Sequence, residues 1–219
     1  MIFEEFYVLL HDFIRFTIMK LVFASNNKHK LGEVRLILPR EIDIISLQEI
    51  GFSQDIDETG DTLEENSELK AKTIWEWLET NRLLGDIDGV FADDTGLEIT
   101  ALGGVPGVRT ARWASEIADD AANRTKALEE LAGVQDRSAQ FRTVITLITH
   151  GKKIQVEGVV RGKISDQEEG EGGFGYDPVF IPEGYKNTFA TLPIETKNSI
   201  SHRGKALERL REVLGHNSI

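Results

Sequence analysis

Blocks of apolar residues alternate with polar segments along the chain, in a pattern that predicts short strands joined by helices. In the first half, apolar runs predict strands at 20–24, 42–46 and 89–92. Apolar side chains at helical spacing predict helices over 31–38, where a proline follows, and over 63–80. With 219 residues, these elements suit one larger α/β domain or two closely joined lobes.

The second half of the chain continues the same pattern. A helix is expected from about 118 to 131, followed by strands at 139–149 and 153–164 that form an antiparallel hairpin. His150 lies in the turn of this hairpin and is expected at the surface. Apolar positions from 206 to 214 fall at helical spacing and predict a final helix.

Two adjacent carboxylates follow the strand predicted at 89–92. Asp93 and Asp94 are expected where this strand emerges, pointing to opposite sides because side chains alternate along a strand. Paired acids in a chain without cysteine favour a site for a hard cation. The alternative is that they cap the strand end. Asp93, which points to the opposite side from Asp94, is expected to support the turn.

The polar segment 25–30 joins the first strand to the first helix. This geometry points free backbone N–H groups at an anion. Ser25 or Asn26 is expected to cap the helix, and Lys28 and Lys30 add cationic donors. The glycines of a Walker loop are absent, so a capped helix with solvated lysines is an equally good interpretation.

A second acidic segment precedes the helix predicted at 63–80. Thr62 and Glu65 form a capping-box pattern at its start. Asp57, Glu58 and Glu65 are the acids that a metal site could recruit, and the other charged residues of this helix are expected on its solvated surface.

Two later segments have the composition of a ligand site. Glycines alternate with aromatic residues over 172–178, which lets a backbone approach a flat ligand closely while a ring stacks on it. His202 and Arg203 fall in the first turn of the last helix, capped by Ser199 or Ser201. Cations oppose the helix dipole there, so their presence indicates a functional role, with two solvated residues as the alternative.

Composition narrows the classes of function. The net charge of −12 repels nucleic-acid backbones and anionic lipid, so neither nucleic acid nor a membrane is an expected partner. The absence of cysteine excludes disulfides, zinc–thiolate sites and thiol nucleophiles. Residues 1–18 are apolar but interrupted by charges, unlike a signal peptide or a membrane span. We interpret them as an extension of unclear role, with Met19 as a possible start.

Four segments together resemble the inosine triphosphate pyrophosphatase family: 21–30 (LVFASNNKHK), 57–72 (DETGDTLEENSELKAK), 91–113 (FADDTGLEITALGGVPGVRTARW) and 172–206 (GGFGYDPVFIPEGYKNTFATLPIETKNSISHRGKA). The resemblance runs from Met19 to about Leu214. It implies an α/β fold with a long, twisted mixed sheet and flanking helices, in which 19–219 form one two-lobed domain around a central cleft. It also implies a cytoplasmic homodimer that uses Mg²⁺ to split ITP, dITP or XTP into monophosphate and pyrophosphate.

The resemblance also assigns roles to residues. It implies that Asp94 accepts the proton and binds the metal with Asp57 or Glu58, although Asp57 stands where the family usually has glutamate. The residues that the resemblance places on the substrate are Ser25, Asn26, Asn27, Lys28, His29 and Lys30 at the triphosphate, Phe174, Gly175, Tyr176 and Asp177 near the base, and Thr95, Lys197, His202 and Arg203 as further contacts. A pyrophosphatase for modified pyrimidine nucleotides and a nucleotide sensor without turnover remain alternatives.

Overall fold

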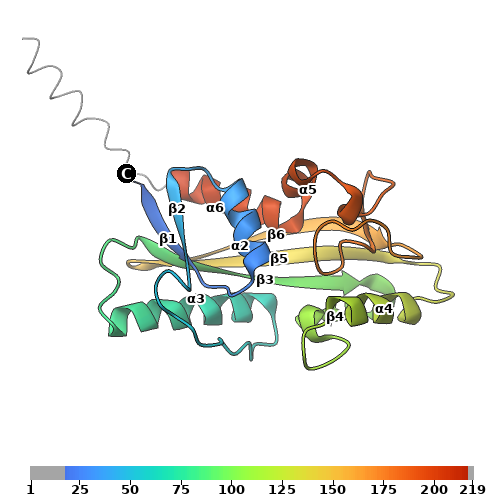
Figure 1. Cartoon of the computed structure of the whole chain (residues 1–219), viewed down its shortest axis with the longest axis horizontal. Coiled ribbons are helices and arrows are strands. Elements are labelled where there is room, and N and C mark those ends of the chain that lie inside the picture. The colour runs from blue at the N-terminus through green and yellow to red at the C-terminus, as the bar shows by residue number, and fades with distance from the viewer. Residues whose placement is uncertain (1–17, 217–219) are drawn as a thin grey trace, which may run out of the picture.

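The computed structural model describes residues 18–216, and it contains a seven-stranded sheet with helices on both faces (Figure 1). Of the extension interpreted at residues 1–18, residues 1–17 lie outside the described residues. The strands are β1 (Met19–Phe23), β2 (Ile42–Ser46), β3 (Gly89–Ile99), β4 (Pro106–Gly107), β5 (Ser138–Thr149), β6 (Lys152–Ile164) and β7 (Phe180–Pro182). The α-helices are α2 (Lys28–Ile37), α3 (Leu63–Thr80), α4 (Asp120–Glu130), α5 (Ile194–Ile200) and α6 (His202–His216). Short 3₁₀ helices span Thr100–Leu102, Thr110–Arg112 and Phe189–Thr191.

The sheet is mixed, as predicted. Its strand order is β2-β1-β3-β5-β6-β7, and β4 pairs with β3 outside this path. β1 runs parallel to β2 and β3, whereas β3, β5, β6 and β7 are antiparallel neighbours. The predicted hairpin is confirmed, since β5 and β6 pair from Ser138 opposite Lys163 to Thr149 opposite Lys152. The predicted α/β class is therefore confirmed; the division into two lobes stays a prediction.

Side-chain alternation in the central strands divides the core between the two faces of the sheet. In β3, Phe91 belongs to the core under α2 and α6, while Val90 and Ala92 belong to the core under α3. The same period of two carries on along β3, so Asp93 faces α2 and α6 and Asp94 faces α3. The prediction that the two carboxylates point to opposite sides is confirmed.

The prediction that the strand ends at Ala92 is wrong. β3 continues to Ile99 because β5 pairs with it along its whole length, from Gly89 opposite Thr149 to Ile99 opposite Ala139. On its other edge, however, β1 stops where Phe23 pairs with Phe91, and β4 pairs only from Leu97 onward. The doublet lies in this gap between β1 and β4. Asp93 therefore supports no turn.

The helix starts differ in part from the prediction. α2 begins at Lys28, and Asn27 is its N-cap in place of Ser25 or Asn26, since the Asn27 side chain accepts a hydrogen bond from the backbone of Lys30 at 3.0 Å. The last helix begins at His202, as expected, and the Ser201 hydroxyl accepts from the backbone of the third residue along at 3.0 Å. The short helix α5 was not predicted. Among the described residues, none of the helices is long and apolar enough to cross a membrane.

Candidate active site

A cleft of about 770 Å³ opens at the gap between β1 and β4. Its walls come from the β1–α2 turn, the segment before α3, β3, the loop before β7, and the first turn of α6. The predicted site residues that line it are Ser25, Asn26, Asn27, His29, Lys30, Asp57, Glu58, Asp94, Thr95, Phe174, Gly175, Tyr176, Asp177, Lys197, His202 and Arg203. Lys28 is the exception, because its side chain is exposed outside the cleft wall.

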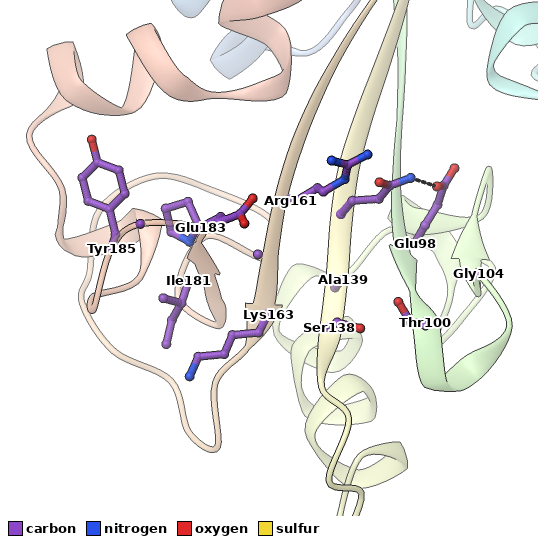
Figure 2. A pocket seen from close by; sticks show the side chains of 14 residues that line it. Glu98, Thr100, Gly104, Ser138, Ala139, Arg161, Lys163, Ile181, Glu183 and Tyr185 are labelled. Atoms are coloured by element: carbon purple, nitrogen blue, oxygen red, sulfur yellow. Dashed lines mark hydrogen bonds between the residues drawn. The ribbon is translucent and has the colours of Figure 1, made fainter.

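A second hollow, of about 680 Å³, lies at the far part of the sheet over β5, β6 and β7 (Figure 2). The Gln140 amide donates a 2.7 Å hydrogen bond to Glu98 at its edge, and the charged side chains Arg161 and Lys163 extend along it. It contains none of the residues that the sequence predicts for the site. The cleft at the doublet is therefore the candidate active site.

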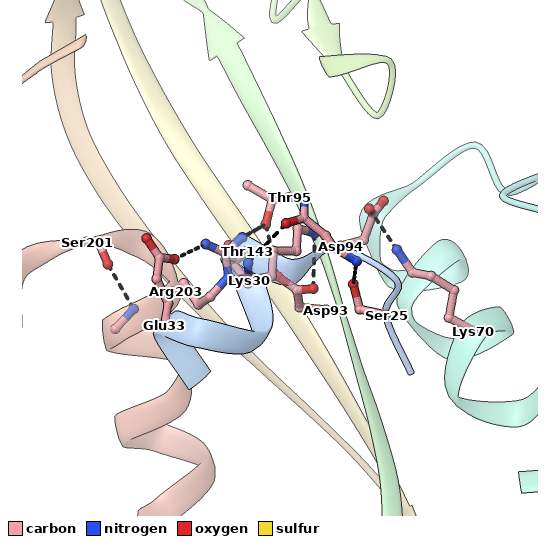
Figure 3. Close-up of polar contacts among 12 residues, drawn as sticks. Ser25, Lys30, Glu33, Lys70, Asp93, Asp94, Thr95, Thr143, Ser201 and Arg203 are labelled. Carbon is pink, nitrogen blue, oxygen red and sulfur yellow. Dashed lines mark hydrogen bonds and ion pairs between the residues drawn. The ribbon is translucent and has the colours of Figure 1, made fainter. Parts of the chain in front are cut away.

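Asp93 links α2 to α6 at the wall of the cleft (Figure 3). One carboxylate oxygen accepts from Lys30 Nζ at 3.0 Å, and the other accepts from Arg203 Nε at 2.9 Å. Burial disfavours the charged form of Asp93, but the positive charges of Lys30 and Arg203 outweigh that effect and lower its pKa below the usual range. Asp93 is thus ionised at neutral pH and anchors two cations.

Glu33 in α2 is a second anchor, which the sequence analysis did not identify. Its side chain lies between two cations, accepting from Lys197 Nζ at 2.8 Å and from Arg203 Nη1. Lys197 also donates to Asp177 at 2.6 Å. Glu33 is 7% exposed, and its pKa is lowered because the neighbouring cations outweigh the effect of burial. This chain of ion pairs fixes the head groups of Lys197 and Arg203 at the cleft wall.

Asp94 faces the other side of the sheet, toward α3. Its Oδ1 accepts from Lys70 Nζ at 3.1 Å, and the same ammonium lies 2.5 Å from Glu58 Oε1. Asp94 Oδ2 is buried and has no hydrogen-bond partner among the described residues. Burial raises the pKa of Asp94 although the charge of Lys70 opposes the shift. A carboxylate with a raised pKa and a free oxygen at a cleft suits a general base.

Lys70 was predicted on the solvated surface of its helix, and that prediction is wrong, since it is only 6% exposed. The spacing contains a signal for its position. Lys70 is three residues after Ser67 and four before Ile74, both of which lie on the buried face of α3. Its ammonium finds two carboxylates there, so burial of the charge is compensated and its pKa is raised.

The glycine-rich loop before β7 places one aromatic ring in the cleft and one in the core. Phe174 stacks on the His29 imidazole, with ring centroids 5.3 Å apart, and Lys197 Nζ lies 4.9 Å from the centre of the same ring. The backbone N–H of Phe174 donates to Asp177 at 2.8 Å. Tyr176 is buried and donates its hydroxyl to the carbonyl of Thr110 at 3.0 Å. Phe174 is thus the ring of this loop that is placed to stack on a flat ligand.

His202 lies deeper in the cleft, stacked on Phe141 with ring centroids 4.6 Å apart. Burial, together with the charges of Arg203 and Lys197, lowers its pKa well below the usual value. The imidazole is therefore neutral at neutral pH. Its Nδ1 is buried and has no partner among the described residues, which leaves a polar atom available to a ligand.

The family resemblance implies Mg²⁺, for which the cleft would have to supply carboxylate ligands. The carboxylates of Glu58 and Asp94 both contact the ammonium group of Lys70, and Asp94 Oδ2 has no partner among the described residues. Residues 18–216 contain no group of three or more acidic, His or Cys side chains arranged for a metal. Mg²⁺ needs only one or two carboxylates when waters and phosphates complete its shell, so the Glu58–Asp94 pair fits. Glu65 instead completes the capping box, accepting from the backbone of Thr62 at 3.1 Å.

Comparison with known proteins identifies the family of this chain. The family model described as the Ham1 family matches residues 21–213. A protein of Flavobacterium johnsoniae named dITP/XTP pyrophosphatase is 48% identical, covering 90% of this chain and 98% of its own length. A protein of the same name from Porphyromonas gingivalis is 49% identical, covering 89% and 97%. The solved Staphylococcus aureus Ham1 protein superposes with a TM-score of 0.79 at 38% identity, covering 91% of this chain and all of its own. The chain belongs to the Ham1 family.

Proposed function

We propose that the protein hydrolyses noncanonical purine nucleoside triphosphates, namely ITP, dITP and XTP, to the monophosphate and pyrophosphate. The observation that carries the proposal is one cleft that joins a helix N-terminus, an acid–lysine cluster and an aromatic loop. The helix N-terminus suits the triphosphate, the acid–lysine cluster suits the phosphorus that reacts, and the aromatic loop suits the base. The relatives named dITP/XTP pyrophosphatase support the same activity.

Asp94 is the general base in this proposal. Its free Oδ2 accepts the proton of a water that attacks the α-phosphorus, and pyrophosphate leaves on the opposite side. The raised pKa brings the carboxylate closer to the range in which it exchanges a proton at neutral pH. Lys70, hydrogen-bonded to Oδ1, orients the carboxylate toward the cleft.

The phosphate groups lie at the start of α2. Free backbone N–H groups at a helix N-terminus favour an anion, and Lys30 adds a positive charge beside them. Mg²⁺, held by Glu58 and Asp94, would offset phosphate charge when bound. Asp57 lines the same wall with an exposed side chain, and its role as a further ligand stays a prediction.

Base selection follows from the neutral state of His202. A neutral imidazole with its proton on Nδ1 donates to the 6-oxo group of hypoxanthine or xanthine, and the unpartnered, buried Nδ1 gains its missing bond. The 6-amino group of adenine is not an acceptor, so it would leave the N–H of His202 without a hydrogen-bond partner. Arg203 keeps the adjoining wall in place through Asp93, Glu33 and a 3.3 Å contact to the Thr95 hydroxyl.

Pyrophosphate release from ITP, XTP, GTP, ATP and a modified pyrimidine triphosphate, with and without Mg²⁺, tests the proposal. We expect ITP and XTP to be turned over far faster than ATP, and only with Mg²⁺. Asp94→Asn is expected to lower kcat by about 10²–10⁴-fold, as loss of a general base does. Asp166→Asn, a change to a carboxylate on the exposed surface, is the matched control. Equal turnover of ATP, or an active Asp94→Asn protein, would refute the assignment.

Two further properties belong to the same proposal. A homodimer in the cytoplasm is consistent with a nucleotide-pool enzyme of this family, and sedimentation of the purified protein checks the dimer. The pyrimidine and sensor alternatives lead to different outcomes in the same assay. Preference for the pyrimidine nucleotide would favour the first, and binding of ITP without release of pyrophosphate would favour the second.

A further inference from the structure

The loop that carries Phe174 is held by α4, a helix that the proposed reaction does not otherwise use, although its Asp120 lines the cleft beside Gly175. Asp120 Oδ2 accepts a hydrogen bond from the backbone N–H of Gly175 at 2.9 Å. Arg124 Nη1 donates to the backbone carbonyl of the same glycine at 3.0 Å. The two side chains are four residues apart on α4 and so share one face of it. The peptide groups on both sides of Gly175 are therefore fixed by one helix.

Arg124 also reaches the segment that leads into the loop. Its Nε lies 3.0 Å from Glu168 Oε1, so a single guanidinium joins both arms of the loop. The segment between them has glycine at four of six positions, 170–175, and Gly175 itself has φ +61°. A glycine-rich backbone has little intrinsic preference for one conformation. Contacts from outside must therefore set the position of this loop.

Phe174 is the residue next to this anchor point. Its ring stacks on His29 and lies under Lys197, at the place proposed for the base. The ring position is sensitive to its backbone, because stacking depends on the offset and angle of the two planes. A shift of Gly175 is thus transmitted to the stacking surface and only weakly to the acids of β3.

α4 itself does not depend on these contacts. Asp119 caps the helix, and Asn123 is bonded to the backbone of Ala111 and Ala114, both at 2.8 Å. Ala127 on the same helix packs in the core. The helix is therefore expected to stay in place when the contacts to Gly175 are removed, and the loop is the part that moves.

We propose that Asp120 and Arg124 are positioning residues that set the place of Phe174 and thereby the affinity and selectivity for the purine base. The inference rests on the proposed function, because it assigns the loop to base recognition. The expected effect is on binding of the base. The chemistry at Asp94 lies on another element and is expected to continue unchanged.

The test compares steady-state kinetics with ITP and ATP for Asp120→Ala and Arg124→Ala. Each variant loses a hydrogen bond with a charged partner, and we expect KM for ITP to rise by about tenfold with kcat within about twofold of wild type. The preference for ITP over ATP is expected to fall in parallel. Asp120→Asn keeps an oxygen acceptor for Gly175 and is expected to restore most of the affinity. Lys126→Ala is the matched control, because it removes an α4 contact to Trp113 instead of the loop.

Unchanged KM and selectivity in both alanine variants would overturn the inference. An equal rise of KM in Lys126→Ala would also overturn it, since the effect would then be a general loosening of α4. A fall in kcat with KM retained would assign the two residues to the chemistry instead. A wild-type protein that released no pyrophosphate from ITP would refute the proposed function alone. Calorimetric binding of ITP to the same variants would then measure the effect of the loop contacts directly.

Discussion

Glu33 offers a sharp test of how the cleft is held together. Glu33→Gln keeps the side-chain volume but removes the charge that lies between Lys197 and Arg203. Breaking a buried ion pair costs about 3–5 kcal/mol. Each cation keeps one carboxylate, Asp177 at 2.6 Å and Asp93 at 2.9 Å, so the lower value of about 3 kcal/mol applies. For a chain of this size, that corresponds to a Tm lowered by about 6–12 °C.

Thermal unfolding followed by circular dichroism at pH 7 measures this loss. Glu208→Gln is the matched control, because Glu208 is half-exposed and pairs with Arg211 on the surface of α6. We expect the control to change stability by less than about 0.5 kcal/mol. A Glu33→Gln protein that melts within about 2 °C of wild type would refute the reasoning, because 1 kcal/mol already shifts Tm by that amount.

The pH dependence of Tm, measured for wild type and for Glu33→Gln, gives a second, independent test. The pKa of Glu33 is lower in the folded protein than in the unfolded chain, so its contribution is present above about pH 4.3 and is lost as the pH falls through the folded value. The difference in Tm between wild type and Glu33→Gln is therefore expected to shrink in acid. A difference that stayed constant down to about pH 2 would contradict the assignment of the charge.

Three further predictions concern single residues. Lys70→Met removes a cation that lowers the pKa of Asp94, so the fall of kcat/KM in acid is expected to begin at a higher pH than in wild type. If the pH profile of kcat/KM is unchanged, the ionisation of Asp94 does not control the rate. His202 is neutral when folded, so the unfolded chain binds one more proton below about pH 6.5 and stability falls there. His202→Asn is expected to flatten this slope in denaturant titrations. Gly158→Ala would place a Cβ 2.0 Å from the backbone of α6, and a loss of about 1–3 kcal/mol is expected in the same titrations.

The sequence predicts much of the site because several signals in it are local. Alternation along a strand correctly places Asp93 and Asp94 on opposite faces, since it depends only on neighbouring residues. The capping box at Thr62 is correct for the same reason. The predicted end of β3 at Ala92 is wrong, because the length of this strand is set by pairing with β5, about fifty residues later in the chain.

The missed residues owe their roles to distant partners. Glu33 pairs with Lys197 and Arg203, which lie 164 and 170 positions further along the chain. No pattern around Glu33 distinguishes it from a surface acid of an amphipathic helix. Lys70 is different, because its spacing from the buried positions of α3 already indicates the buried face. A charged side chain is expected at the surface, and the two carboxylates that stabilise Lys70 in a buried position, Glu58 and Asp94, lie on other segments of the chain.

The ion pairs around Glu33 and Asp93 have a consequence for the order in which the molecule folds. The β5–β6 hairpin closes between adjacent segments, whereas the Glu33–Arg203 contact closes a loop of 170 residues. Closing a longer loop costs more conformational entropy, so contacts between distant residues form late. During synthesis, α2 and β3 leave the ribosome with Lys30 available to Asp93, but Glu33 lacks both of its cations and Asp93 lacks Arg203 until α5 and α6 follow. Recovery of enzyme activity after refolding should therefore lag behind recovery of β-sheet signal, and activity reports on the completed chain.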